Sequence, residues 1–114
     1  MLPKINRLKR KKDFERVFKK GKKFKEDLLL LKIIKNNLGL NRFGFVVSQK
    51  VSKKAAVRNK IKRRFRAIAG KEIKKNKKGL DILFIVLPGL EKKEFQDVEK
   101  VINKLFQKAG IKND

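Results

Sequence analysis

The sequence has no cysteine and no histidine. Without cysteine there can be no disulfide, no thiolate nucleophile and no cysteine-ligated zinc site. Without histidine the chain also lacks the commonest general base and metal ligand of proteins. Neither the phosphate-binding nor the dinucleotide-binding glycine pattern occurs. We therefore expect none of these kinds of active site in the chain.

Acidic residues are scarce, with 11 Asp and Glu against 35 Lys and Arg, and the net charge is +24. No acid lies between Asp27 and Glu72, whereas residues 79–114 carry equal numbers of acidic and basic residues. A composition that is merely rich in lysine would supply matching glutamates throughout. The acid-free middle instead predicts a basic face for a polyanion. Most acids stand beside lysines on expected helix faces, which argues against a carboxylate active site.

Long apolar runs are also missing, and none approaches the ~18 residues of a membrane span. The first five residues are too polar for a secretory signal, so we expect a cytoplasmic protein that does not contact a membrane. The length of 114 residues, 40% of them apolar, suits one domain, 1–114, with a modest core. Residues 1–10 are basic and unpatterned, and we expect them to form a flexible arm.

Hydrophobic periodicity predicts three helices and three strands. The helices are expected at 11–20, about 55–69, ending at Gly70, and about 92–108; the strands are expected at 28–35, 42–48 and 80–87. The first two strands should form an antiparallel hairpin, and the third is apolar enough to be a central strand covered on both faces. The order α-β-β-α-β-α indicates an α+β fold with helices on a small sheet. If the βαβ unit is parallel, the general rule makes its crossover right-handed.

The helix expected at 55–69 contains half of the eight arginines in a chain whose usual cation is lysine. Its apolar stripe is formed by Val57, Ile61, Phe65 and Ile68, and the opposite side by Asn59, Arg63 and Arg66, with Lys62 at the border and Arg58 beside the stripe. A guanidinium can pair two phosphate oxygens at once, which lysine cannot. Because no acid stands four residues away to pair with these cations, a nucleic-acid contact is favoured over a merely solvated face.

Two further groups are candidate contacts. Phe14 and Phe18 lie among lysines, so they could stack on single-stranded bases or simply pack the first helix onto the sheet. Ser48 and Lys50, with Lys53 and Lys54, stand in a basic loop that could bind phosphate or be solvated. The motifs of DNA-reading proteins are absent, so RNA is the better expectation than DNA.

Three blocks of residues resemble the bacterial ribonuclease P protein subunit. They are Arg58-Asn59-Lys60-Ile61-Lys62-Arg63 with Arg66, then Asp13-Phe14-x-x-Val17-Phe18-x-x-Gly21, and Arg42-Phe43-Gly44-Phe45-Val46-Val47-Ser48 followed by Lys50. The usual form of the first block is Arg-Asn-Arg-x-Lys-Arg-x-x-Arg. Lys60 departs from it, so charge is kept there but bidentate pairing is lost.

The resemblance implies an RNA-based enzyme that removes the 5′ leader of precursor tRNA, with hydrolysis by the catalytic RNA and its Mg²⁺. It implies a small mixed sheet like the second domain of ribosomal protein S5, with a left-handed crossover. The catalytic RNA would meet Arg58, Asn59, Lys62, Arg63 and Arg66. The leader would lie in a cleft with Phe14, Phe18, Arg42, Ser48 and Lys50, where Phe18 is expected to be partly buried. The alternative is a ribosomal or ribosome-assembly RNA-binding protein without a processing role.

Overall fold

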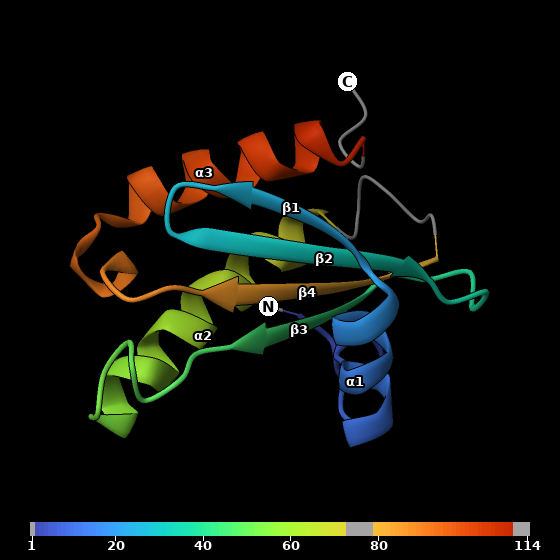
Figure 1. Ribbon diagram of the computed structural model, residues 1–114, viewed down its shortest axis with the longest axis horizontal. Coiled ribbons are helices and arrows are strands. Elements are labelled where there is room, and N and C mark those ends of the chain that lie inside the picture. Colours follow the sequence, from blue (N-terminus) through green and yellow to red (C-terminus); the bar gives the residue numbers. More distant parts are fainter. Residues whose placement is uncertain (1, 73–78, 111–114) are drawn as a thin grey trace.

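A computed structural model describes residues 2–72 and 79–110 and gives an α+β fold, as predicted (Figure 1). Its elements are α1 (Lys11–Lys20), β1 (Lys22–Glu26), β2 (Leu29–Lys35), β3 (Arg42–Val46), α2 (Ala55–Glu72), β4 (Leu80–Val86) and α3 (Phe95–Lys108), with short 3-10 turns at Lys4–Asn6 and Leu90–Lys92. All six predicted elements are present, but β1 was missed. Its sequence, Lys-Lys-Phe-Lys-Glu, has one apolar residue, so it carries almost no hydrophobic signal.

The four strands are ordered β1-β2-β4-β3. The apolar strand β4 is interior, as predicted, and pairs antiparallel with β2 and parallel with β3. The predicted hairpin between β2 and β3 is therefore wrong, because β4 lies between them. The hairpin partner of β2 is β1, through a turn in which Asp27 has a φ of 52°. Nearness in sequence suggested the wrong pair, whereas burial of the most apolar strand decided the order.

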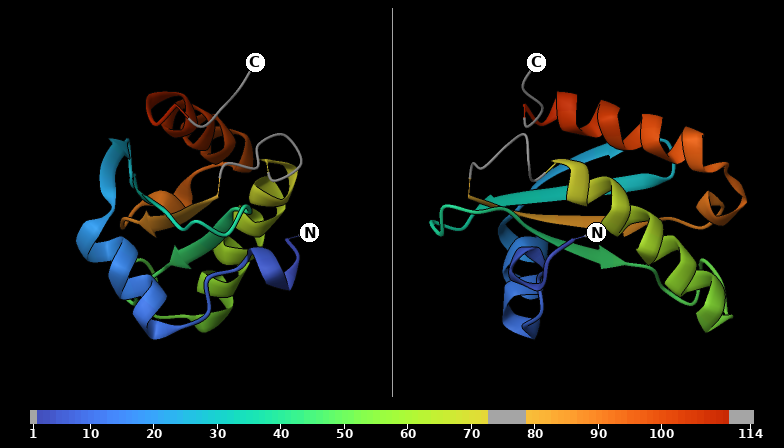
Figure 2. Two further views of the ribbon diagram at one scale, coloured as in Figure 1. Left: turned by 90° about the vertical axis from the view of Figure 1, so that its right-hand side faces the viewer. Right: turned by 180° about the vertical axis from the view of Figure 1, so that it is seen from behind.

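The β3-α2-β4 crossover is left-handed. In the right-hand view of Figure 2, α2 lies in front of the sheet, β3 and β4 both point to the right, and β4 lies above β3. When the strands are turned to point upward, β4 falls to the left of β3, which is the left-handed arrangement. The general expectation of a right-handed crossover is wrong for this chain, and the handedness implied by the family resemblance is confirmed.

The sheet has helices on both faces, with α2 and α3 on one and α1 on the other (Figures 1 and 2). The larger core lies under α2 and α3, where Phe84 of β4 stacks on Phe43, Phe45 and Phe65 at ring-centroid separations of 5.5 to 6.5 Å. The predicted stripe of α2 is confirmed, since Ile61, Phe65 and Ile68 are buried and Val57 packs against this core. The helix runs on through Gly70 to Glu72 instead of ending there. None of the helices in the described ranges is long and apolar enough to cross a membrane.

The N-terminal segment is anchored and differs from the flexible arm that we expected. Leu2 and Leu8 are only 1% and 6% exposed. The Leu8 amide donates to the Phe43 carbonyl at 2.8 Å, and Arg7 forms a parallel bridge with Phe43. Because β3 is an edge strand, its free backbone groups can accept this segment, and the two leucines fill apolar sites beside it. The basic composition of the segment concealed both anchors.

Candidate nucleic-acid interface

The outer face of α2 presents cations that have no partner among the described residues 2–72 and 79–110. Asn59 and Arg63 are exposed, and Lys62 and Arg66 are half-buried. No hydrogen bond or ion pair ties any of these four side chains to the residues that the structure describes. The buried stripe fixes the helix on the sheet, so this predicted face is rigidly placed and available to a polyanion.

Two other arginines of α2 are engaged within the protein. Arg58 Nη1 donates to the Ser52 carbonyl at 2.9 Å and so holds the loop that precedes the helix. The Arg64 guanidinium lies 5.8 Å from the centre of the Phe95 ring, which joins α2 to α3. Arg58 is half-buried, so it is less free than Arg63 for a contact with RNA.

Phe14 and Phe18 of α1 lie in different surroundings. Phe14 is half-buried and packs with the small cluster of Leu8, Val17 and Leu83 between α1 and the sheet. Phe18 is 54% exposed, and its ring faces the Lys32 ammonium at 4.1 Å. The expectation of a partly buried Phe18 is therefore wrong. Val17, which is fully buried, and Phe14 pack α1 onto the sheet, which leaves the Phe18 ring open to a ligand.

Gly44 of β3 makes the close approach of α1 and the N-terminal segment possible. A Cβ atom at this position would lie 2.7 Å from Phe14 Cε1 and 2.9 Å from Leu8 Cδ1. Both distances are well inside van der Waals contact, so a side chain here would push Phe14 and Leu8 away from the sheet.

Three neighbouring hollows form a groove from α1 across β3 to α2. The first, of about 200 Å³, lies beside Phe14, Phe18, Val46 and Leu83, with Glu15 and Lys19 at its edge. The second, of about 160 Å³, is lined by Arg7, Leu8, Phe14, Phe43, Gly44, Phe45, Lys62 and Arg66. The third, of about 420 Å³, is lined by Arg7, Arg63, Arg66 and Ala67. Phe14 is shared by the first two hollows, and Arg7 and Arg66 by the last two. We call these three hollows together the groove.

A buried ion pair holds the sheet face on which α1 packs. Asp81 of β4 is fully buried and accepts hydrogen bonds from Arg42 Nε at 2.8 Å and Nη2 at 2.7 Å. Asn36 Nδ2 donates to Asp81 at 2.9 Å, and two residues of α1, Asp13 and Arg16, approach the pair at 3.5 and 3.8 Å. The hydrogen bonds to Asp81 raise the pKa of the Arg42 guanidinium above its ordinary value. Arg42 thus has a structural role that sequence reasoning missed.

The remaining predicted residues lie outside the groove. Ser48 and Lys50 are exposed in the loop between β3 and α2 and line none of its three hollows. Arg42 does not line them either. The structure therefore brings together Phe14, Phe18, Lys62, Arg63 and Arg66. It adds Arg7, which lies in a segment without a sequence pattern, and Gly44, which belongs to the Arg42–Ser48 block but was not predicted as a site residue.

Comparison with known proteins identifies the family. The sequence model of the ribonuclease P family matches residues 2–110. The chain belongs to the ribonuclease P protein family. It is 37% identical over 111 residues to the ribonuclease P protein component of Clostridium botulinum strain 657, covering 96% of this chain and 99% of the relative. It is 40% identical to the ribonuclease P protein component of Synechocystis, covering 96% and 90%.

Solved ribonuclease P proteins share the fold. The protein from Thermotoga maritima superimposes with a TM-score of 0.80 at 31% identity, covering 94% of this chain and 98% of that one. A Staphylococcus aureus ribonuclease P protein gives a TM-score of 0.87 at 25% identity, covering 95% and 98%. The chain is thus the protein component of the enzyme that processes the 5′ end of tRNA. The ribosomal alternative is not favoured.

Proposed function

We propose that the groove, with Lys62 and Arg66 on its α2 side, holds the single-stranded 5′ leader of precursor tRNA, while the exposed Asn59 and Arg63 on the outer face of α2 bind the catalytic RNA. The partners in this proposal are that RNA and precursor tRNA, with no part for DNA or a membrane, and the site of action is the cytoplasm. The observation that carries it is the position of Phe14. Its ring lines one hollow with Phe18 and the next with Lys62 and Arg66, so an aromatic surface leads directly to free cations.

The groove suits a single strand better than a duplex. Phe18 offers an exposed ring, and a base stacked on an aromatic side chain contributes about 1–3 kcal/mol by alanine substitution. Stacking tolerates any base, which is needed if leaders differ in sequence. Lys62 and Arg66 of α2 line the hollow next to Phe14, where the backbone phosphates of a strand that passes Phe14 would meet them.

Hydrolysis is assigned in this proposal to the catalytic RNA and its Mg²⁺. The described residues contain no group of three or more carboxylates that could hold a metal ion. Asp81, the one fully buried acid among the described residues, is paired with Arg42. The groove is lined mainly by apolar and basic side chains, so these residues do not fit a magnesium site. The role of the chain is to bind RNA and offset the repulsion between the catalytic RNA and its substrate.

The decisive experiment adds the purified chain to a bacterial ribonuclease P RNA at low magnesium and measures 5′ cleavage of precursor tRNA. We expect faster cleavage with the chain than without it, and none with the chain alone. Equal rates with and without the chain would contradict the proposal. Cleavage by the chain alone, in a preparation free of RNA, would contradict the assignment of hydrolysis to the RNA.

Arg63→Ala tests the role of the α2 face in binding the catalytic RNA. Arg63 is exposed and unpaired in the described part of the chain, so the variant should fold normally. We expect weaker binding of the catalytic RNA. We also expect the slope of log affinity against log salt concentration to become shallower by about one. Lys100→Ala removes an exposed cation of α3 that lies outside the groove, and it is the control. Equal affinity for the two variants would contradict the assignment.

A further inference from the structure

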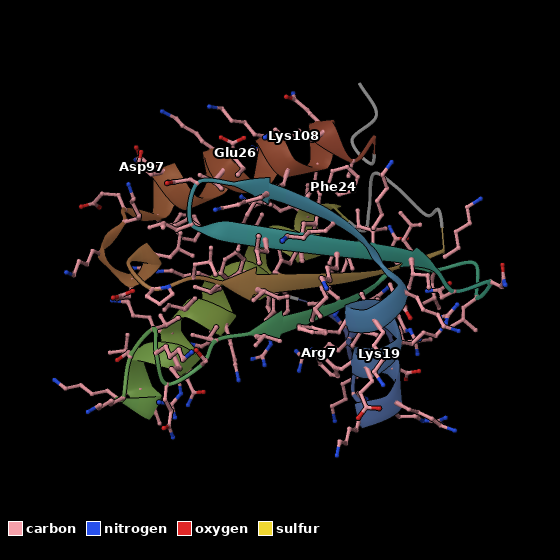
Figure 3. All side chains as sticks on the ribbon, in the orientation of Figure 1. Arg7, Lys19, Phe24, Glu26, Asp97 and Lys108 are labelled. Carbon is pink, nitrogen blue, oxygen red and sulfur yellow. The ribbon has the colours of Figure 1, made fainter. Side chains whose placement is uncertain are left out.

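Arg7 occupies a position that the basic composition of the N-terminal segment did not reveal. It lines two adjoining hollows of the groove, one with Phe14 and Lys62 and the other with Arg63. Figure 3 labels Arg7 beside β3, in the space between α1 and α2. The N-terminal segment is thus a wall of the groove and not a tail beside it.

The backbone and side chain of Arg7 are held in place. Its backbone bridges to Phe43, and the next residue, Leu8, is buried and hydrogen-bonded to the same strand. The Arg7 Nε donates to the Leu2 carbonyl at 3.0 Å, and Leu2 is itself buried. Both ends of the segment are therefore anchored. A guanidinium fixed in this way loses little conformational freedom on binding a ligand.

The Nη atoms of Arg7 remain available. Within the described residues, no ion pair or further hydrogen bond involves them, and no acid lines either hollow that Arg7 shares with Arg66. Lys62 and Arg66 lie one turn apart on α2 and complete the cationic side of the 160 Å³ hollow, whose floor is Phe14, Gly44 and Phe45. Three cations from two elements therefore face an apolar floor without a compensating carboxylate.

We infer that Arg7, Lys62 and Arg66 form a subsite for one backbone phosphate of the leader, at the point where the strand passes from Phe14 to α2. Three nearby like charges are unfavourable unless an anion lies between them. A phosphate diester suits this site because a guanidinium can donate two parallel hydrogen bonds to its oxygens. The floor can meanwhile contact the adjoining sugar or base. The inference rests on the proposed function and adds a residue and a ligand group to it.

The test uses holoenzyme assembled from the catalytic RNA and the full chain. The substrates are precursor tRNAs in which one leader phosphate at a time is replaced by an uncharged methylphosphonate. With the wild-type chain, replacing the phosphate at one leader position should weaken binding of the precursor tRNA by about tenfold, which is the low end for the loss of a charge-assisted hydrogen bond. With Arg7→Gln, the unmodified substrate should already bind about tenfold more weakly, and the methylphosphonate at that position should have little further effect.

Arg10→Gln is the matched control because Arg10 is exposed on the same segment and lines none of the three hollows. Like the wild type, this variant should bind the precursor tRNA more weakly when the methylphosphonate stands at that one leader position. Arg7→Lys retains the charge without the planar fork and should fall between the wild type and Arg7→Gln. If Arg7→Gln lowers the unfolding midpoint, Arg66→Gln replaces it, because it should abolish sensitivity at the same leader position.

The outcomes separate this inference from the proposed function. If the wild-type holoenzyme binds precursor and mature tRNA equally, the leader does not occupy the groove and the proposed function fails. If the leader matters but Arg7→Gln keeps the wild-type profile, only the phosphate subsite is overturned. A loss of affinity for the catalytic RNA with unchanged leader sensitivity would assign Arg7 to that RNA and also overturn the subsite.

Discussion

Replacing Arg42 with methionine should destabilise the fold strongly by leaving Asp81 without its main partner. Asp81 is fully buried, so water cannot replace the two hydrogen bonds that Arg42 donates at 2.8 and 2.7 Å. Removing one member of a buried pair costs about 3–5 kcal/mol, because an uncompensated charge remains. Asn36 at 2.9 Å and Arg16 at 3.8 Å would still face the carboxylate, which favours the lower end, about 3 kcal/mol.

The double variant Arg42→Met with Asp81→Ala should recover much of this loss. It leaves no buried charge, and the flexible methionine can fill part of the space vacated by the shortened side chain on β4. Asn36 would keep its hydrogen bond to the Leu40 carbonyl at 3.0 Å. We expect the double variant to be about 1–2 kcal/mol less stable than the wild type, so the coupling between the two positions should be at least about 1 kcal/mol.

The assay is urea unfolding followed by circular dichroism. Every sample contains the same sulfate concentration, because anions screen the repulsion within a chain of net charge +24. Arg63→Met is the matched control, since it removes the same charge from an exposed site and should change stability by less than about 0.5 kcal/mol. If Arg42→Met is no less stable than this control, or the two substitutions are additive, the buried pair does not hold the sheet as argued.

Four further substitutions test other contacts. Gly44→Ala should destabilise the fold by about 1–3 kcal/mol and weaken leader binding, because its Cβ would meet Phe14 at 2.7 Å; unchanged binding and stability would contradict this. Phe18→Ala should weaken the binding of precursor tRNA but not of mature tRNA, and it should leave the unfolding midpoint unchanged, since Phe18 is 54% exposed. Phe14→Ala should lower both the affinity for precursor tRNA and the unfolding midpoint, because Phe14 packs between α1 and the sheet. The hydrogen bond from Lys108 lowers the pKa of Glu26 from its ordinary value of 4.5, and Figure 3 labels both side chains. The stabilisation by this pair is therefore present above pH 4.5 and is lost as the pH falls through the lowered pKa of Glu26. Lys108→Met should therefore be less stable than the wild type at pH 7, and the difference should shrink toward pH 3 in urea unfolding; a difference that does not change with pH would refute the assignment.

Local patterns in the sequence were sufficient for the helices and for the character of β4. The spacing of Ile61, Phe65 and Ile68 identified the buried side of α2, and the same spacing put Arg63 on the outside. These patterns are informative because the side chains of a helix or strand return to the same face every few residues. A short stretch of sequence therefore shows which face is apolar and buried. The strand β1 was missed because a charged edge strand needs little apolar surface and leaves no such record.

Contacts between distant segments could not be predicted in this way. The pairing of Arg42 with Asp81 requires β3 and β4 to lie in parallel register, with these two residues opposite each other. The anchoring of the N-terminal segment requires β3 to be an edge strand. Both depend on the strand order, which is set by the burial of all four strands together and not by any one segment.

The sequence by itself determined that the chain is a basic α+β protein of the ribonuclease P family, with an arginine-rich helical face suited to RNA. Composition, periodicity and the three motif blocks are local properties, so they can be recognised without knowing how distant segments pack together. Only the tertiary structure decided that Phe18 is open, that Arg42 is engaged by Asp81, and that Arg7 and Arg66 line the same two hollows. The physical reason is that a groove is formed by side chains from separate elements, whose meeting depends on how the whole core packs.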